Sequence, residues 1–163
     1  NRVERAAALD AFGWFGSKGM ADVTSMLADP DPELAAEAFE AWQTSLNEIS
    51  DDSLRCELIV DAAKLVENDP EMATLMMELT QIDSTAMAVE TLDKIIIAED
   101  STAAAKDAAR DIYQHLCDAD YTDHETAVQK AAQIREEDEK IDPERAAQLR
   151  ALFEKAFGGS GNQ

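Results

Sequence analysis

The chain has 163 residues, 45% of them hydrophobic, and a domain of this length buries roughly 70% of its unfolded surface if it is globular. Its 35 acidic and 14 basic residues give a formal net charge of −21, which repels nucleic-acid phosphates and anionic lipid headgroups. We therefore expect neither nucleic acid nor membrane among the partners. Because the sequence also lacks the run of about 18 apolar residues that crosses a bilayer, we expect a soluble domain with no membrane insertion.

Apolar residues recur three and four positions apart along almost the whole chain, which is the period of an amphipathic helix. Strand-like alternation of polar and apolar residues is missing, so we predict an all-α fold. The predicted helices, in chain order, are Arg2–Phe15, Lys18–Leu27, Pro32–Leu46, Asp51–Glu67, Pro70–Gln81, Thr85–Ala98, Thr102–Cys117, Glu125–Asp138 and Pro143–Phe157. We expect one helical domain over residues 1–157 and a flexible Gly-rich tail over residues 158–163.

Three predicted helices begin at a proline that follows an aspartate, namely Pro32, Pro70 and Pro143. A proline is tolerated there because the amides of the first turn have no acceptor within the helix, and the preceding aspartate can cap those amides. The earlier pair Asp29-Pro30 is expected to end the preceding helix, since the residue before a proline avoids the α conformation. The sequence LADPDPE therefore predicts a tight turn between two antiparallel helices.

The prolines are also spaced like the boundaries of repeated units. Pro32 and Pro70 are 38 residues apart, and Pro70 and Pro143 are 73 apart, close to twice that spacing. This pattern favours helix pairs that repeat with a period in the upper thirties. The middle boundary is weaker, because Asp100-Ser101-Thr102 offers a capping residue but no proline.

Lys94-Ile95-Ile96-Ile97 is the one segment that favours a strand, because consecutive β-branched residues prefer an extended backbone. We nevertheless predict a helix here. Val89, Leu92 and Ile96 continue the helical spacing of the preceding residues. A single strand without a partner would also leave its backbone groups unpaired.

The segment RAAALDAFGWFG, Arg5–Gly16, resembles the second helix of a HEAT repeat, with an aliphatic residue, an arginine, small residues, a large apolar residue and then glycine. Three later segments match this pattern less closely. They place Leu34, Ala38, Ala41 and Trp42, then Met72, Met76, Leu79 and Thr80, then Ala105, Lys106, Ala109, Ile112 and Tyr113 at the corresponding positions. The resemblance implies an α-α superhelix, or solenoid, of about four antiparallel helix pairs. An armadillo array is the alternative, whereas the signature of tetratricopeptide repeats is absent.

Methionines and one tryptophan are candidates for the core of such a stack. We expect Met72, Met76 and Met77 to fill irregular gaps in the core, and an adaptable methionine-rich binding surface is the alternative. Trp42 is expected in the core because it shares a helical face with Leu34. A surface anchor for a partner is the other interpretation of Trp42.

Few features of the sequence indicate catalysis or metal binding. Cys56 and Cys117 form neither a disulfide framework nor a CxxC motif, so we interpret them as buried apolar residues. GWFGSKG, Gly13–Gly19, lacks the phosphate-loop spacing and is interpreted as a helix cap and turn. HLCDADYTDHE, His115–Glu125, gathers both histidines, one cysteine and several acids. His115 and Cys117 would project about 200° apart on a helix, so a solvated turn is favoured over a metal site. We expect no catalytic residue, metal or cofactor.

The resemblance implies that the second helix of each pair lines the concave face, where a partner would bind. The polar residues on these helices are therefore the candidate partner-binding residues: Glu33, Glu37, Glu40, Glu71, Thr74, Glu78, Lys106, Asp107, Arg110 and Asp111. If the pairs stack in register, the acids form a negative ridge that attracts a basic segment of a partner. The alternative is that they only keep the surface hydrated.

These observations predict a non-catalytic scaffold that binds a protein or peptide partner on its concave face. A HEAT-like enzyme or enzyme-accessory domain of the lyase type, or a structural segment of a longer repeat protein, are the alternatives. The chain begins at Asn1, without a methionine, within a predicted helix. Such a start leaves room for an upstream signal, anchor or further repeats, so the compartment, cytoplasmic or exported, and the oligomeric state are left open.

Overall fold

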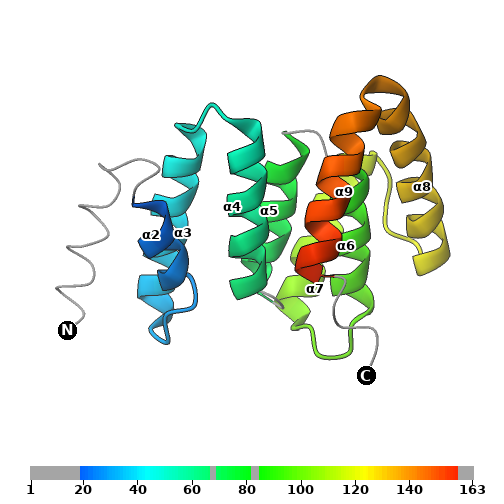
Figure 1. The fold of residues 1–163 in the computed structure, drawn as a ribbon. Coiled ribbons are helices and arrows are strands. Elements are labelled where there is room, and N and C mark those ends of the chain that lie inside the picture. Colours follow the sequence, from blue (N-terminus) through cyan, green and yellow to red (C-terminus); the bar gives the residue numbers. More distant parts are fainter. Residues whose placement is uncertain (1–18, 67–68, 82–84, 158–163) are drawn as a thin grey trace. The chain divides into compact units, whose positions relative to one another are not determined.

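The computed structural model of the chain describes residues 19–66, 69–81 and 85–157 (Figure 1). Within these ranges all regular structure is α-helical and no strand is present, which confirms the predicted all-α class. In chain order the helices are α2 (Met20–Met26), α3 (Pro32–Asn47), α4 (Asp52–Leu65), α5 (Pro70–Thr80), α6 (Thr85–Ile97), α7 (Ala103–Cys117), α8 (His124–Ile141) and α9 (Pro143–Phe157). The predicted first helix, and with it Arg5–Gly16, lies outside the described residues.

Helices α3, α5 and α9 begin at the three prolines that the sequence singled out. The Asp31 side chain accepts the amide of Glu33 at 3.1 Å, and Asp29 Oδ1 accepts the amide of Asp31 at 2.9 Å. Asp142 caps α9 in the same way. Asp29 thus stabilises the turn between α2 and α3, and Asp31 caps the start of α3, as expected from their positions before proline.

Asp69 differs from the other two aspartates because its side chain makes no hydrogen bond to the amides of α5. Burial, reinforced by the neighbouring Asp69 carboxyl, raises the pKa of Glu71 above its ordinary value. A proline at the first helical position can therefore start α5 without a side-chain cap.

Lys94-Ile95-Ile96-Ile97 is helical and forms the end of α6, as predicted. Ile95 and Ile96 are buried, whereas Ile97 is 49% exposed. The apolar contacts of two neighbouring isoleucines thus outweigh the strand preference of the three β-branched residues.

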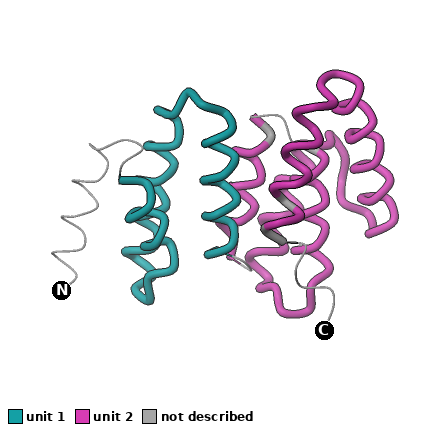
Figure 2. The backbone as a smooth tube through the Cα atoms, viewed as in Figure 1, with its two compact units in different colours: residues 1–66 teal, residues 67–163 magenta. Residues whose placement is uncertain are grey.

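The chain divides into two compact units, residues 1–66 and 67–163 (Figure 2). In the first unit, α2 contacts both α3 and α4. Trp42 is fully buried, stacks on Phe39 and donates its indole N–H to Thr24 Oγ1 at 3.0 Å. The Thr24 hydroxyl in turn donates a hydrogen bond to the backbone carbonyl of Met20 at 2.6 Å. Trp42 is therefore a core residue, and the prediction that it packs inside is confirmed.

The second unit contains α5 to α9. Within it α5 contacts α6 and α7, α6 contacts α7 and α8, and α8 contacts α9. Its core is made by apolar residues of the first three of these helices, among them Met72, Leu75, Met76, Leu79, Val89, Leu92, Ala105, Ala109 and Tyr113. Burial of Met72 and Met76 confirms the prediction that methionines fill the core. Met77, on the other side of α5, is only half-buried.

Both cysteines are buried and neither forms a disulfide, as predicted. Cys56 lies on α4 in the first unit and Cys117 ends α7 in the second. Burial raises the pKa of the Cys117 thiol, which keeps the sulfur in its less reactive protonated form.

Trp42→Ala is expected to lower the free energy of unfolding by about 3 to 5 kcal/mol, because it removes a fully buried indole and the partner of Thr24. Trp42→Phe should cost less, since most of the apolar volume is retained. Urea denaturation followed by circular dichroism measures both effects. Thr44→Ala, at an exposed position of the same helix, is the control. A Trp42→Ala variant as stable as this control would contradict the assignment to the core.

Candidate functional site

Asp93 is the most deeply buried acid among the described residues, with 4% of its surface exposed. It lies on the apolar face of α6, one turn from Val89. A carboxyl group in such a place is strongly destabilising unless hydrogen-bond donors surround it. The Asp93 side chain hydrogen-bonds two side chains from another part of the sequence, so it is the centre of a polar cluster.

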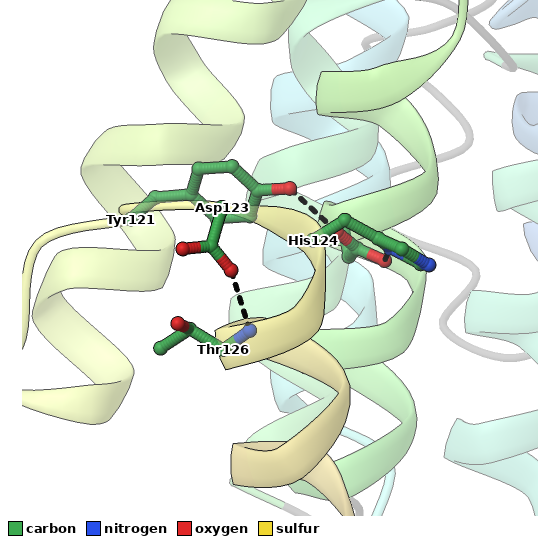
Figure 3. A network of polar contacts seen from close by, with 5 residues as sticks. Tyr121, Asp123, His124 and Thr126 are labelled. Carbon is green, nitrogen blue, oxygen red and sulfur yellow. Dashed lines mark hydrogen bonds and ion pairs between the residues drawn. The ribbon is translucent and has the colours of Figure 1, made fainter.

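The two partners are Tyr121, in the segment that joins α7 to α8, and His124, the first residue of α8 (Figure 3). The Tyr121 hydroxyl donates to Asp93 Oδ1 at 2.6 Å, and Nδ1 of His124 lies 2.7 Å from Oδ2. We refer to Asp93, Tyr121 and His124 as the Asp93 cluster. It attaches the start of α8 to α6 through contacts 28 and 31 residues apart in sequence.

Tyr121 is held from its other side as well. Its ring packs edge-on against Tyr113 of α7, with 5.2 Å between the ring centroids. Burial, together with the hydrogen bond to Asp93, raises the pKa of Tyr121 well above its ordinary value. The phenol therefore keeps its proton at neutral pH and remains a donor.

The segment around the cluster is shaped by two further aspartates. Asp118 ends α7 with a left-handed backbone, φ 49°, a conformation that aspartate tolerates better than most residues. Asp123 begins α8 and accepts the amide of Thr126 at 2.7 Å (Figure 3). Hydrogen bonding from Thr126 lowers the pKa of Asp123 below its ordinary value. The turn and the helix start together place His124 against Asp93.

Nδ1 of His124 faces Asp93, so Nε2 is the ring nitrogen that does not contact the carboxyl, on a side chain that is 59% exposed. An imidazole oriented by a carboxylate in this way can accept a proton or ligate a metal. Within the part of the chain that the structure describes, however, no three His, Cys, Asp or Glu side chains are grouped so as to hold a metal ion. The cluster is therefore best described as an anchor for α8.

The sequence singled out His115–Glu125, and the structure divides that segment. His115 is exposed and Cys117 is buried, in agreement with their predicted divergence along the helix. Tyr121 and His124 do meet a carboxylate, but it is Asp93, which the sequence analysis did not select. The sequence feature that could have identified Asp93 is its position among apolar residues of α6, since Val89, Asp93 and Ile96 share one helical face.

A second feature of the same unit is an open groove of about 720 Å³ along α5 and α7. It is lined by Met77 of α5 and by Asp111, Ile112, Gln114, His115 and Asp118 of α7 and its end. We call this the α5–α7 groove. Its lining combines two apolar side chains with two carboxylates, an amide and an imidazole, so it offers both apolar contact and negative charge.

The candidate partner-binding residues fall in both units. In the first unit, Glu33, Glu37 and Glu40 are all exposed on α3. In the second, Asp107, Arg110 and Asp111 are exposed on α7, Lys106 is half-buried, and Arg110 pairs with Asp107 at 3.2 Å. Asp111 is the member of this set that lines the α5–α7 groove.

The candidates on α5 differ from the exposed positions expected for a ridge. Glu71 and Thr74 are half-buried, and Glu78 is 8% exposed. The physical reason is that α5 packs against both α6 and α7, so two of its sides are covered. Glu78 therefore lies inside the second unit, whereas Met77 next to it reaches the groove.

Tyr121→Phe removes one of the two donors to a buried carboxyl, so the free energy of unfolding should fall by about 1 to 3 kcal/mol. His124→Ala removes the other donor. Because the two side chains share Asp93, the loss in the double variant should differ from the sum by more than about 0.5 kcal/mol. Urea denaturation measures all three, with His115→Ala as the control for an exposed histidine. Strictly additive losses would argue against a shared cluster.

The lowered pKa of Asp123 predicts a pH-dependent contribution to stability. A carboxyl whose pKa is lower in the folded chain stabilises it above the unfolded value, 3.8, and this contribution disappears as the pH falls through the folded value. Asp123→Asn keeps a capping side chain but removes the charge. It should therefore be less stable than the parent at about pH 6 and approach it below about pH 3. A constant difference across this range, in thermal unfolding, would contradict the assignment.

No family model, curated protein or solved structure matches the chain. Within the described residues, no helix combines the length and apolar character that a membrane span requires. The Asp93 cluster and the α5–α7 groove are thus the features from which a function can be argued.

Proposed function

We propose that the chain is a non-catalytic protein-interaction module, and that its second unit receives a segment of a partner protein in the α5–α7 groove. The observation that carries this proposal is the composition of the groove. Met77 and Ile112 supply apolar surface, while Asp111 and Asp118 supply charge within the same depression. Binding sites for protein segments combine these two elements, since apolar contact provides affinity and charge provides orientation.

The charge of the groove selects a basic segment. Two carboxylates line it, and the chain as a whole carries a formal charge of −21. A segment with lysine or arginine on either side of one bulky apolar residue would place its cations near Asp111 and Asp118 and its apolar side chain on Met77 and Ile112. The surrounding field would also speed the encounter with such a segment.

The packing of the second unit supports a stack of helix pairs as the scaffold for this groove. Contacts occur between helices two positions apart in the chain, α5 with α7 and α6 with α8, as well as between neighbours. This pattern is typical of solenoids, in which each helix packs on the equivalent helix of the next pair. We therefore propose a HEAT-like solenoid, with α5 and α7 as equivalent second helices that face the partner.

A library of displayed peptides selected against the whole protein would test the proposal. We expect enrichment of sequences with lysine or arginine next to a bulky apolar residue. For a selected peptide, the double variant Asp111→Lys, Asp118→Asn should raise the dissociation constant at least about tenfold, a loss of about 1.4 kcal/mol in binding free energy. The loss should be larger at low salt. Isothermal titration calorimetry measures both quantities.

Glu37→Lys with Glu40→Lys is the matched control, because it reverses two exposed charges on α3 in the first unit. Met77→Ala tests the apolar part of the groove separately from its charge. If the α3 control weakened peptide binding equally, binding would depend on general charge attraction and not on the groove. Selected peptides without cationic residues would contradict the proposed partner.

A further inference from the structure

Helix α8 buries little apolar surface for its length. Of its 18 residues, the buried ones are Ala127 and Ala131. By comparison, α6 buries Val89, Leu92 and Ile96 along with several smaller residues. Alanines let α8 lie close to α6, with which it makes its main contact. Each alanine removes only one methyl group from water, so apolar burial alone holds α8 weakly.

Polar contacts between α8 and α6 supply what the alanines lack. At the start of α8, the Asp93 cluster joins the two helices. Further along, Arg135 of α8 forms an ion pair with Glu90 of α6. Both side chains of that pair are 37% exposed, so its contribution is small. The Asp93 cluster, whose carboxyl is buried, is therefore the main specific attachment of α8.

Helix α9 follows α8 in this arrangement, because its main contact is with α8. Among its described side chains, Leu149 is the buried apolar one. Among the described side chains, neither helix thus buries a large apolar surface against α5, α6 and α7. Parts of a protein held in this way open more readily than the core, in separate cooperative steps.

We propose that residues 121–157 form an arm that opens from α6 and α7 while α5, α6 and α7 stay folded, with the Asp93 cluster as its latch. In the open form Asp93, Tyr121 and His124 exchange their contacts with one another for contacts with water. Opening therefore replaces three protein hydrogen-bonding groups by three hydrated ones, at a modest loss of apolar contact.

Opening would remove Tyr121 from the side of α7 on which its ring packs against Tyr113. Cys117 lies one helical turn from Tyr113, and the two residues are 8% and 1% exposed. The Cys117 thiol is thus a built-in reporter of the arm, protected when the latch is closed.

Thiol modification of the full chain tests the arm. In a Cys56→Ala background, Cys117 is the remaining cysteine, and its rate of reaction with a disulfide reagent reports its exposure. We expect Tyr121→Phe with His124→Ala to raise this rate at least about tenfold, because the closed form then holds a buried carboxyl without its donors. Arg135→Gln should raise it about two- to threefold. Arg110→Gln, which breaks an exposed ion pair within α7, should leave it unchanged.

Hydrogen exchange on the same variants separates arm opening from loss of the whole unit. The proposal predicts faster exchange in α8 and α9 and unchanged exchange in α5. In mild urea, the modification rate of Cys117 should increase with urea concentration. The free energy of opening derived from this rate should depend less steeply on urea than the free energy of global unfolding, because opening exposes less surface. Equal acceleration in α5, a slope equal to that of global unfolding, or a Cys117 rate insensitive to the latch variants would each overturn the proposal.

Discussion

Self-repulsion is the constraint under which this chain folds. A formal charge of −21 on 163 residues works against any compact form. The few cations relieve it only in part, through ion pairs that are mostly exposed, such as Lys64 with Asp61 and Arg110 with Asp107. The folded state therefore depends on apolar contacts between helices, and on keeping nearly every acid at the surface.

Among the described acids, Glu78 and Asp93 are buried, and Asp93 is the more deeply buried of the two. Its two carboxyl oxygens lie against the phenol of Tyr121 and the imidazole of His124. One acid is therefore the point at which α6, the segment after α7 and the start of α8 meet.

The helices were largely predictable because their determinants are local. Proline positions, capping aspartates and apolar spacing lie within one or two turns of the boundary they set, and the prolines mark the starts of α3, α5 and α9. The Asp93 cluster was not predictable in the same way, because its partners are 28 and 31 residues from Asp93. Helical spacing alone also could not tell that Glu78 is covered by neighbouring helices while Met77 is not.

Position 118 is where two requirements on the chain compete. The left-handed backbone that ends α7 would suit glycine best, yet the residue is an aspartate whose side chain lines the α5–α7 groove. Selection for a stable helix end alone would favour glycine or asparagine there. If aspartate is retained at this site, the negative charge in the groove matters more than the strain of a left-handed backbone at a residue other than glycine, so stability is reduced in favour of recognition. The amino acids that descendants of this sequence tolerate at position 118 would thus record which of the two demands natural selection has weighed more heavily.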